Sequence, residues 1–218
     1  SNGVSWAWTG PNGFSSASQN PNITSVTTGA TGTYSISVTD VNGCVGTGTI
    51  AVVVNPLPTV TVNSVAICNG QQVANLTASG ASTYSWSAGT SPSTGSAVVA
   101  TPSSTTSYTV TGTDLNGCVN TATTTVTVFN LPVITVNSPS ICLGSSATLT
   151  ASGGNTYNWS AGTTPSSGAT VSVSPNATTS YTVSGTDANG CISDAISTVT
   201  VNAQLAINAG NNDTVCIG

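Results

Sequence analysis

The residues that could carry chemistry in this chain are six cysteines and five aspartates. The 218-residue sequence contains no lysine, arginine, histidine, methionine or glutamate. Without histidine, lysine or glutamate, no side chain is suited to activate a serine or threonine as a nucleophile. Asp187 and Asp194 lie seven residues apart, and we interpret them as a turn residue and an exposed strand residue. The sequence therefore predicts a protein that is not an enzyme and has no cofactor.

The cysteines form two interleaved series with a period of 73 or 74 residues. The early cysteines are Cys68, Cys142 and Cys216, and the late cysteines are Cys44, Cys118 and Cys191. No Cys-x-x-Cys pair accompanies them, and there is no histidine. Structural disulfides in an oxidising, extracellular setting are therefore favoured over a zinc site.

Each late cysteine ends an eleven-residue stretch that occurs three times, at residues 34–44, 108–118 and 181–191. Apolar and polar residues alternate from the first tyrosine to an aspartate, which predicts a half-buried strand. The segment Asp-x-Asn-Gly-Cys follows and predicts a hairpin turn. The predicted turn residues are Asp40, Asn42, Gly43, Asp114, Asn116, Gly117, Asp187, Asn189 and Gly190.

Two turn lengths are compatible with Asn-Gly. A two-residue loop would pair Tyr34 with Ala51 and place the apolar residues of the next strand opposite the polar face. A three-residue loop, with Gly43 left-handed as a bulge, pairs Tyr34 with Ile50 and aligns the apolar faces. It also points each late cysteine toward the core, so we predict the bulged turn. The same count sets Val110 against Ala122 and Val183 against Ala195.

Short alternating segments separated by turn signals surround this motif and show no helical period. They predict an all-β chain, a tandem array of small antiparallel β-sandwich domains. The predicted division is a partial domain at 1–55, complete domains at 56–130 and 131–203, and the start of a further domain at 204–218. The predicted core aromatic residues are Trp6, Trp86, Trp159, Tyr34, Tyr108 and Tyr181. Trp8 is left open between the core and an exposed platform.

A core of this size usually needs a covalent staple. From the constant spacing and the inward parity we predict bridges within each repeat, Cys68 to Cys118 and Cys142 to Cys191. Cys44 and Cys216 then lack partners within this sequence. Either they bridge to residues of a longer chain, or separate chains assemble head to tail, with residues 203–218 donated to the first repeat and a Cys44–Cys216 cross-link.

The segments Trp8-Thr9-Gly10-Pro11-Asn12-Gly13-Phe14, Gly32-Thr33-Tyr34 and Asp-x-Asn-Gly-Cys resemble the PKD-like and immunoglobulin-like repeats of Bacteroidota surface proteins. Such repeats occur in gliding-motility adhesins and other proteins exported by type IX secretion. The resemblance covers essentially the whole chain and implies a cell-surface or secreted location and a stalk or adhesion role. It also makes Thr214, in Asp213-Thr214-Val215, a candidate O-glycosylation site. Gly32-Thr33-Tyr34 resembles the tyrosine corner of immunoglobulin domains.

Several classes of partner are excluded by composition. Without lysine or arginine the chain cannot neutralise nucleic-acid phosphates, and no apolar run approaches the length of a membrane span. Calcium would require several carboxylates, whereas each repeat offers mostly one, so we interpret the recurring aspartates as turn residues without a metal. The expected partners are neighbouring repeats, with other copies in a filament and surface glycans as further candidates.

Two functions are carried forward from these observations. The first is a non-enzymatic structural segment of a giant adhesin or extracellular fibre, acting as a disulfide-stapled stalk. The alternative is a carbohydrate-binding accessory module of a secreted protein, which would need an exposed aromatic row that only Trp8 suggests.

Overall fold

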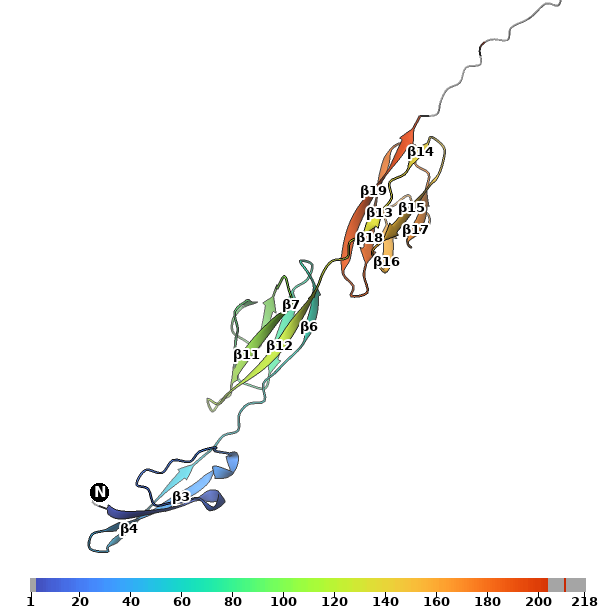
Figure 1. Ribbon diagram of the computed structural model, residues 1–218. Coiled ribbons are helices and arrows are strands. Elements are labelled where there is room, and N and C mark those ends of the chain that lie inside the picture. Colours follow the sequence, from blue (N-terminus) through green and yellow to red (C-terminus); the bar gives the residue numbers. More distant parts are fainter. Residues whose placement is uncertain (1–2, 204–209, 211–218) are drawn as a thin grey trace, which may run out of the picture. The chain divides into compact units, whose positions relative to one another are not determined.

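The computed structural model describes residues 3–203 and residue 210. The chain is all-β and immunoglobulin-like, with antiparallel sheets and two short 3₁₀ helices among the described residues (Figure 1). No helix in this part of the chain is long and apolar enough to cross a membrane. The chain divides into two compact units. Unit 1 comprises Ser1–Val65, Asn75–Ala100 and Ser107–Thr125, and unit 2 comprises Ala66–Ala74, Thr101–Thr106 and Val126–Gly218.

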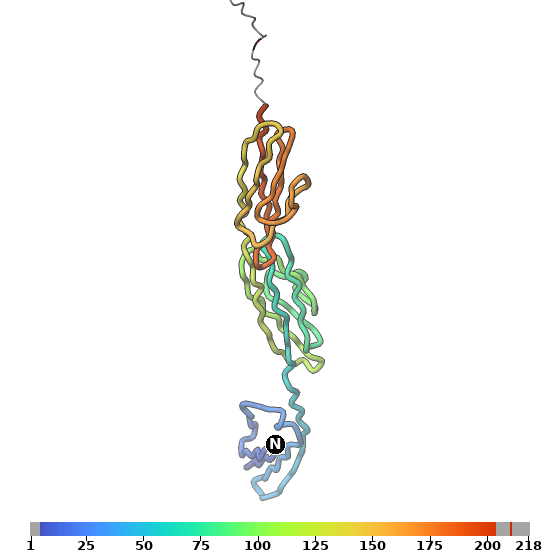
Figure 2. The backbone as a smooth tube through the Cα atoms, turned by 90° about the vertical axis from the view of Figure 1, so that its right-hand side faces the viewer, coloured from blue at the N-terminus to red at the C-terminus, as the bar shows by residue number. Residues whose placement is uncertain are grey.

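Residues 131–203, within unit 2, form a sandwich of two sheets. The smaller sheet has the order β13 (Thr135–Val136), β15 (Ala147–Ser152) and β17 (Thr170–Val173). The larger sheet has the order β14 (Ser140–Cys142), β19 (Ile192–Asn202), β18 (Thr179–Thr186) and β16 (Thr156–Trp159). Figure 2 shows these strands, coloured yellow to red, from a second direction.

The core of this sandwich is built from the inward positions of both sheets. In β15 every second residue is buried, and β17 alternates in the same way, so each strand presents one apolar face. Leu149, Val171, Val183 and Val199 are at most 2% exposed and meet between the sheets. The Trp159 ring is also buried, and its Nε1 donates a hydrogen bond to the Gly168 carbonyl at 2.9 Å. The largest side chain of the core therefore has its apolar ring buried and its one polar atom hydrogen-bonded.

One strand pairing differs from the antiparallel expectation. Strand β14 runs parallel to β19, and Cys142 lies beside Asn202 at the end of that strand. Strand β19 pairs with β18 along one edge, which leaves its opposite edge free to pair with β14. The chain thus enters the larger sheet at the edge formed by its own last strand.

The predicted hairpin register is confirmed in the first and third copies of the motif. Tyr34 pairs with Ile50 in the first copy of the motif, and Val183 pairs with Ala195 in the third. In the first turn the Asp40 N–H donates to the Cys44 carbonyl and the Gly43 N–H donates to the Asp40 carbonyl. Gly43 has a φ of 81°, which a residue with a side chain rarely adopts. The three-residue turn keeps the apolar faces of both strands on one side.

Residues 56–130 contain two further sheets. One has the order β5 (Thr61–Val62), β7 (Ala74–Ser79), β10 (Ala97–Ala100) and β9 (Thr90–Ser91). The other has the order β6 (Val65–Cys68), β12 (Val119–Phe129), β11 (Thr106–Thr113) and β8 (Thr83–Trp86). Leu76, Trp86, Tyr108 and Val110 are buried here, and the Trp86 Nε1 donates to the Gly95 carbonyl.

Residues 3–55 form a single sheet among the described residues. Its order is β2 (Ser15–Ser16), β1 (Gly3–Thr9), β3 (Gly32–Asp40) and β4 (Val45–Val52). The 3₁₀ helices η1 (Pro11–Gly13) and η2 (Thr28–Ala30) lie in the connection between β1 and β3. The hydroxyl of the buried Tyr34 donates a hydrogen bond to the Ala30 carbonyl at 2.9 Å. This bond holds η2 against the start of β3.

We predict that Trp159→Ala lowers the free energy of unfolding by about 3–5 kcal/mol, because it removes a buried ring and leaves a cavity. Denaturant unfolding followed by far-UV circular dichroism measures the change. Ile196→Ala, at a position 66% exposed in the same sandwich, is the matched control and should change little. Equal effects of the two substitutions would contradict the assignment of Trp159 to the core.

Candidate functional site: a disulfide junction between repeats

The three Asp-x-Asn-Gly-Cys turns share one hydrogen-bond pattern. In the third copy the Asp187 Oδ1 accepts the backbone N–H groups of Asn189 and Cys191 at 2.8 and 2.9 Å. Asp40 and Asp114 make the equivalent pairs of bonds, each at 2.8 Å. The aspartate thus holds the following cysteine at a fixed place beside the first residue of the next strand.

The first of these turns lowers the pKa of its carboxyl group, that of Asp40. The hydrogen bond from the Cys44 N–H is the largest cause, and it lowers the pKa of Asp40 below its ordinary value. The N–H of Asn42 acts in the same direction, while desolvation acts against both. Hydrogen bonds to the ionised form favour that form.

The aspartates are not gathered into a metal site in the part of the chain that the structure describes. No group of three potential ligands occurs among residues 3–203. The Asp194 Oδ1 accepts a hydrogen bond from the Ser184 hydroxyl at 2.6 Å, across the β18–β19 pair. Each of the four described aspartates therefore accepts hydrogen bonds from its own hairpin.

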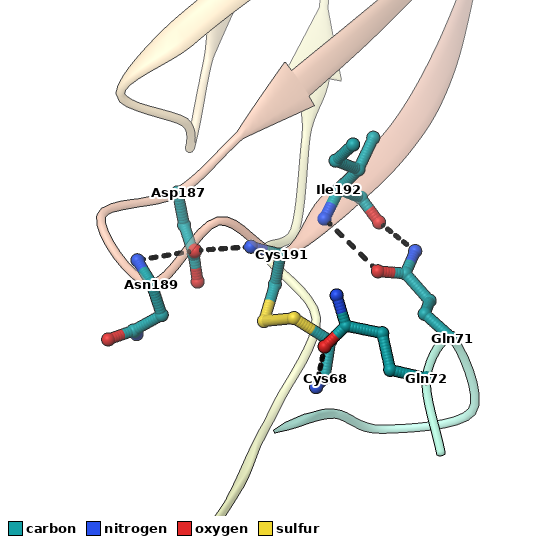
Figure 3. The surroundings of a disulfide bond; sticks show 7 residues. All are labelled: Cys68, Gln71, Gln72, Asp187, Asn189, Cys191 and Ile192. Atoms are coloured by element: carbon teal, nitrogen blue, oxygen red, sulfur yellow. Dashed lines mark hydrogen bonds between the residues drawn. A yellow bond between two sulfur atoms is a disulfide. The ribbon is translucent and has the colours of Figure 1, made fainter. Parts of the chain in front are cut away.

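Cys68 and Cys191 are joined by a disulfide, with their Cα atoms 5.5 Å apart (Figure 3). Cys68 ends strand β6, and Cys191 directly precedes β19. Both are almost completely buried, at 3% and 0% exposed. The bond spans 123 residues and connects the early cysteine of one sequence repeat with the late cysteine of the next.

Two glutamines reinforce this junction. The Gln71 amide forms a pair of hydrogen bonds with the backbone of Ile192, donating from Nε2 to the carbonyl and accepting the N–H at Oε1 (Figure 3). The Gln72 Oε1 accepts the Cys68 N–H at 3.4 Å. Sequence reasoning missed these residues, although Gln71-Gln72 is the one adjacent glutamine pair in the sequence and follows Cys68 by three residues. The junction is therefore both covalent and hydrogen-bonded.

The predicted pairing within repeats is wrong. Cys142 lies beside Asn202 at the far end of β19, whereas Cys191 precedes Ile192 at its start. Eleven strand residues separate the two ends, a distance of about 33 Å at the usual rise per residue. A disulfide requires Cα atoms within about 7 Å. The early and late cysteines of one repeat therefore cannot meet.

The second repeat shows the same separation. The Asn69 N–H donates to the Phe129 carbonyl, which places Cys68 at the end of β12, while Cys118 precedes the start of that strand. Cys44, Cys118 and Cys142 have free thiols, and Cys44 is exposed although its parity predicted an inward position. Cys216 and Thr214 lie outside the described residues, so neither the predicted cross-link nor the glycosylation site is placed.

The strand register also changes the assignment of the first two tryptophans. Trp8 pairs with Ile36, as Trp86 pairs with Val110 and Trp159 with Val183. Trp8 is thus the counterpart of the two core tryptophans. From the sequence, Trp6 had been predicted to take that core position. The error arose because the alternation places both rings on one face, and only the pairing with β3 decides between them.

Trp8 differs from its counterparts in its surroundings. It is half-buried, and its Nε1 has no hydrogen-bond partner, although the atom itself is shielded from solvent. It lines an apolar hollow of about 310 Å³ together with Phe14, Ile23, Tyr34 and Val52. This hollow lies within unit 1.

Comparison with known proteins agrees with the fold. Residues 130–204 match the family model "Ig-like domain CHU_C associated". No curated protein sequence matches the chain. Similar solved structures include a 1.5-MDa bacterial ice-binding adhesin, at 19% identity over 93% of this chain and 88% of that chain, with a TM-score of 0.39.

Two further structures are similar at the same low level. A Ca²⁺-stabilized adhesin of an Antarctic bacterium shares 15% identity over 94% of this chain and 67% of that one, with a TM-score of 0.39. Sidekick-1 immunoglobulin domains 1–5 share 16% identity over 92% of this chain, with a TM-score of 0.31. The chain spans 52% of that Sidekick-1 structure. At these scores the likeness carries no information about activity or partners.

We predict that digestion of the non-reduced protein before its aspartates releases fragment 40–113 joined to fragment 187–193, because these contain Cys68 and Cys191. Mass spectrometry identifies the pair. Cys44→Ser is the control, since Cys44 shares the first fragment and its loss should leave the linked pair unchanged. A link between 114–186 and 187–193 in its place would support the pairing within repeats, because it would join Cys191 to Cys142.

The carboxyl group of Asp40 should titrate below about 3.9, the ordinary value for aspartate. Because its pKa is lowered in the folded state, the turn contributes stability above the unfolded pKa and loses it as the pH falls through the folded pKa. A carbon-detected NMR titration of Asp40 measures the midpoint, and the same chain in concentrated urea is the reference. Equal midpoints in the two samples would show that the hydrogen bonds to the carboxylate do not persist.

Proposed function

We propose that this chain is a non-enzymatic structural segment of a large cell-surface adhesin or extracellular filament, acting as a disulfide-stapled stalk. The observation that carries the proposal is the bond between Cys68 and Cys191, which joins successive repeats. Each of the segments 56–130 and 131–203 is proposed as one sandwich domain, with 1–55 and 204–218 as parts of others.

The position of the disulfide determines how tension would pass through the chain. A pull on the two termini reaches Cys68, crosses the sulfur–sulfur bond and continues from Cys191. Residues 69–190 lie in the closed loop and are relieved of the load. They include most of the sandwich core between β13 and β18. Strand β19, which supplies Val199 to the core, lies outside the loop and carries the load, while the bond limits how far the chain can extend, as suits a mechanical role.

The proposed location is the cell surface or the extracellular space. A buried disulfide is stable in an oxidising compartment and is rare in a reducing cytosol. The match of residues 130–204 to an Ig-like family supports the adhesin role. We extend this to the PKD-like repeats of Bacteroidota surface proteins, including gliding-motility adhesins exported by type IX secretion, on the basis of the sequence motifs.

One observation favours the alternative function of a carbohydrate-binding module. Trp8, Phe14 and Tyr34 line an apolar hollow, and aromatic side chains are common in the walls of ligand-binding sites. A glycan array with the wild type and Trp8→Ala tests this. Binding that is lost in Trp8→Ala and kept in Trp159→Phe would favour the module over the stalk.

We predict that single-molecule stretching of the oxidised chain gives a final length about 430 Å shorter than that of the reduced chain, because the bond closes off a sequence separation of 123 residues at about 3.5 Å each. The double variant Cys68→Ser with Cys191→Ser is the control and should reach the full length without reductant. Equal lengths for the oxidised and reduced wild type would remove the basis for a disulfide-stapled stalk.

A further inference from the structure

The dipeptide Asn-Gly occurs three times within residues 56–203, and one copy differs from the others in its hydrogen bonds. Asn-Gly is chemically labile, because the glycine nitrogen can attack the asparagine side-chain carbonyl carbon with no side chain in its way. The glycine nitrogen must lose its proton to react. A hydrogen bond that holds the glycine N–H therefore slows the reaction.

Two copies lie in the hairpin turns, where the glycine N–H is held. The Gly117 N–H donates to the Asp114 carbonyl and the Gly190 N–H donates to the Asp187 carbonyl, each at 3.2 Å. The N–H of the preceding asparagine donates to the aspartate Oδ1 in both turns. Hydrogen bonding to the neutral form of a group disfavours its ionised form, so these two glycine nitrogens are poor nucleophiles.

The third copy, Asn69-Gly70, lies in the turn that follows Cys68. The Gln71 N–H donates to the Cys68 carbonyl at 3.2 Å, and Gly70 has the positive φ, 71°, that the third residue of a type II turn requires. In the part of the chain that the structure describes, neither the Gly70 N–H nor the Asn69 side chain has a hydrogen-bond partner. The Gly70 nitrogen is therefore the most reactive of the three.

The surroundings of this turn leave room for a ring and for water. Gly70 is exposed, and apart from its chain neighbours no atom lies within 4 Å of the position that a Cβ would take. Asn69 and Gly70 border a hollow of about 320 Å³, together with residues 71–73 and 101–103. A cyclic imide can form at this turn and be reached by water.

The turn itself does not require an asparagine. In the next repeat the Ser145 N–H donates to the Cys142 carbonyl at 3.0 Å, and Gly144 has a φ of 86°. Leu143 stands there in the place of Asn69. Because the same turn forms around a leucine, its backbone geometry does not account for Asn69.

We propose that Asn69-Gly70 is a self-modification site, at which Asn69 deamidates through a cyclic imide. The Gly70 nitrogen loses its proton to hydroxide and bonds to the Asn69 Cγ. The bond from Cγ to the side-chain nitrogen breaks, and that nitrogen takes up a proton from water and leaves as ammonia. Water then opens the imide at either carbonyl, which gives aspartate or isoaspartate. The reaction does not depend on the stalk role.

The modification changes the junction between repeats. Isoaspartate adds one carbon to the backbone between Cys68 and Gly70, so the turn that places Gln71 changes its shape. The Gln71 amide then loses its pair of hydrogen bonds with the Ile192 backbone, while the disulfide stays intact. The junction keeps its covalent link and loses its second contact.

The first experiment ages the full oxidised chain in mildly alkaline buffer and locates each conversion by chymotryptic digestion and tandem mass spectrometry. We expect Asn69 to convert severalfold faster than Asn116 or Asn189, although those two are the more exposed side chains. In concentrated urea with reductant the three should convert at similar rates, since only the fold distinguishes them. Leu143→Asn should create a second fast site in the matching turn.

The second experiment follows hydrogen exchange at the Ile192 amide, which donates to the Gln71 Oε1. We expect severalfold faster exchange in the aged wild type than in the fresh one. Asn69→Gln keeps an amide but does not form the ring readily, so ageing should leave its exchange unchanged. Fresh Asn69→Asp carries the charge without the additional carbon and should exchange like fresh wild type.

Three results would overturn the proposal. Equal or faster conversion of Asn116 or Asn189 in the folded chain would show that exposure governs the reaction. A Leu143→Asn site that stays intact would show that this turn does not promote it. Complete conversion of Asn69 with unchanged exchange at Ile192 would exclude the effect on the junction.

Discussion

The length of strand β19 is the constraint on which the cross-linking of this chain depends. Its eleven residues hold Cys191 at one end of the larger sheet and Asn202, with Cys142 beside it, at the other. The parallel pairing of β14 fixes this arrangement, since it brings the early cysteine to the exit of the sandwich rather than to its entrance. The early cysteine can therefore form a disulfide only with a cysteine of another repeat.

The junction combines two interactions of different reach. The disulfide fixes one point between Cys68 and Cys191, and the Gln71 amide pairs with the next residue along as a short piece of sheet would. A single covalent link leaves rotation about the bond, whereas a second contact a few ångströms away restricts it. Buried sulfur atoms and a two-point hydrogen bond together give a defined geometry.

Much of the fold was predictable from residue alternation alone. The pairing of Tyr34 with Ile50 followed from the requirement that apolar faces coincide, and a slip of one residue would have reversed every side chain. The cysteine pairing could not be obtained in this way. The odd or even position of a residue along a strand predicts which face of the sheet its side chain lies on. It does not predict which end of that strand lies near a neighbouring strand. Trp6 rather than Trp8 was assigned to the core because the two rings share one face of the strand. Gln71 was missed because no sequence pattern predicts the partner of a long polar side chain.

The Cys68–Cys191 bond also changes what a single break in the backbone would do. Cleavage of any one peptide bond between residues 68 and 191 leaves the two pieces attached through sulfur. The segment from the end of β6 to the start of β19 can thus be nicked once without separating what lies before it from what lies after it. In the extracellular location proposed above, where peptidases are not controlled by the producing cell, a single cut within this segment would not divide the chain.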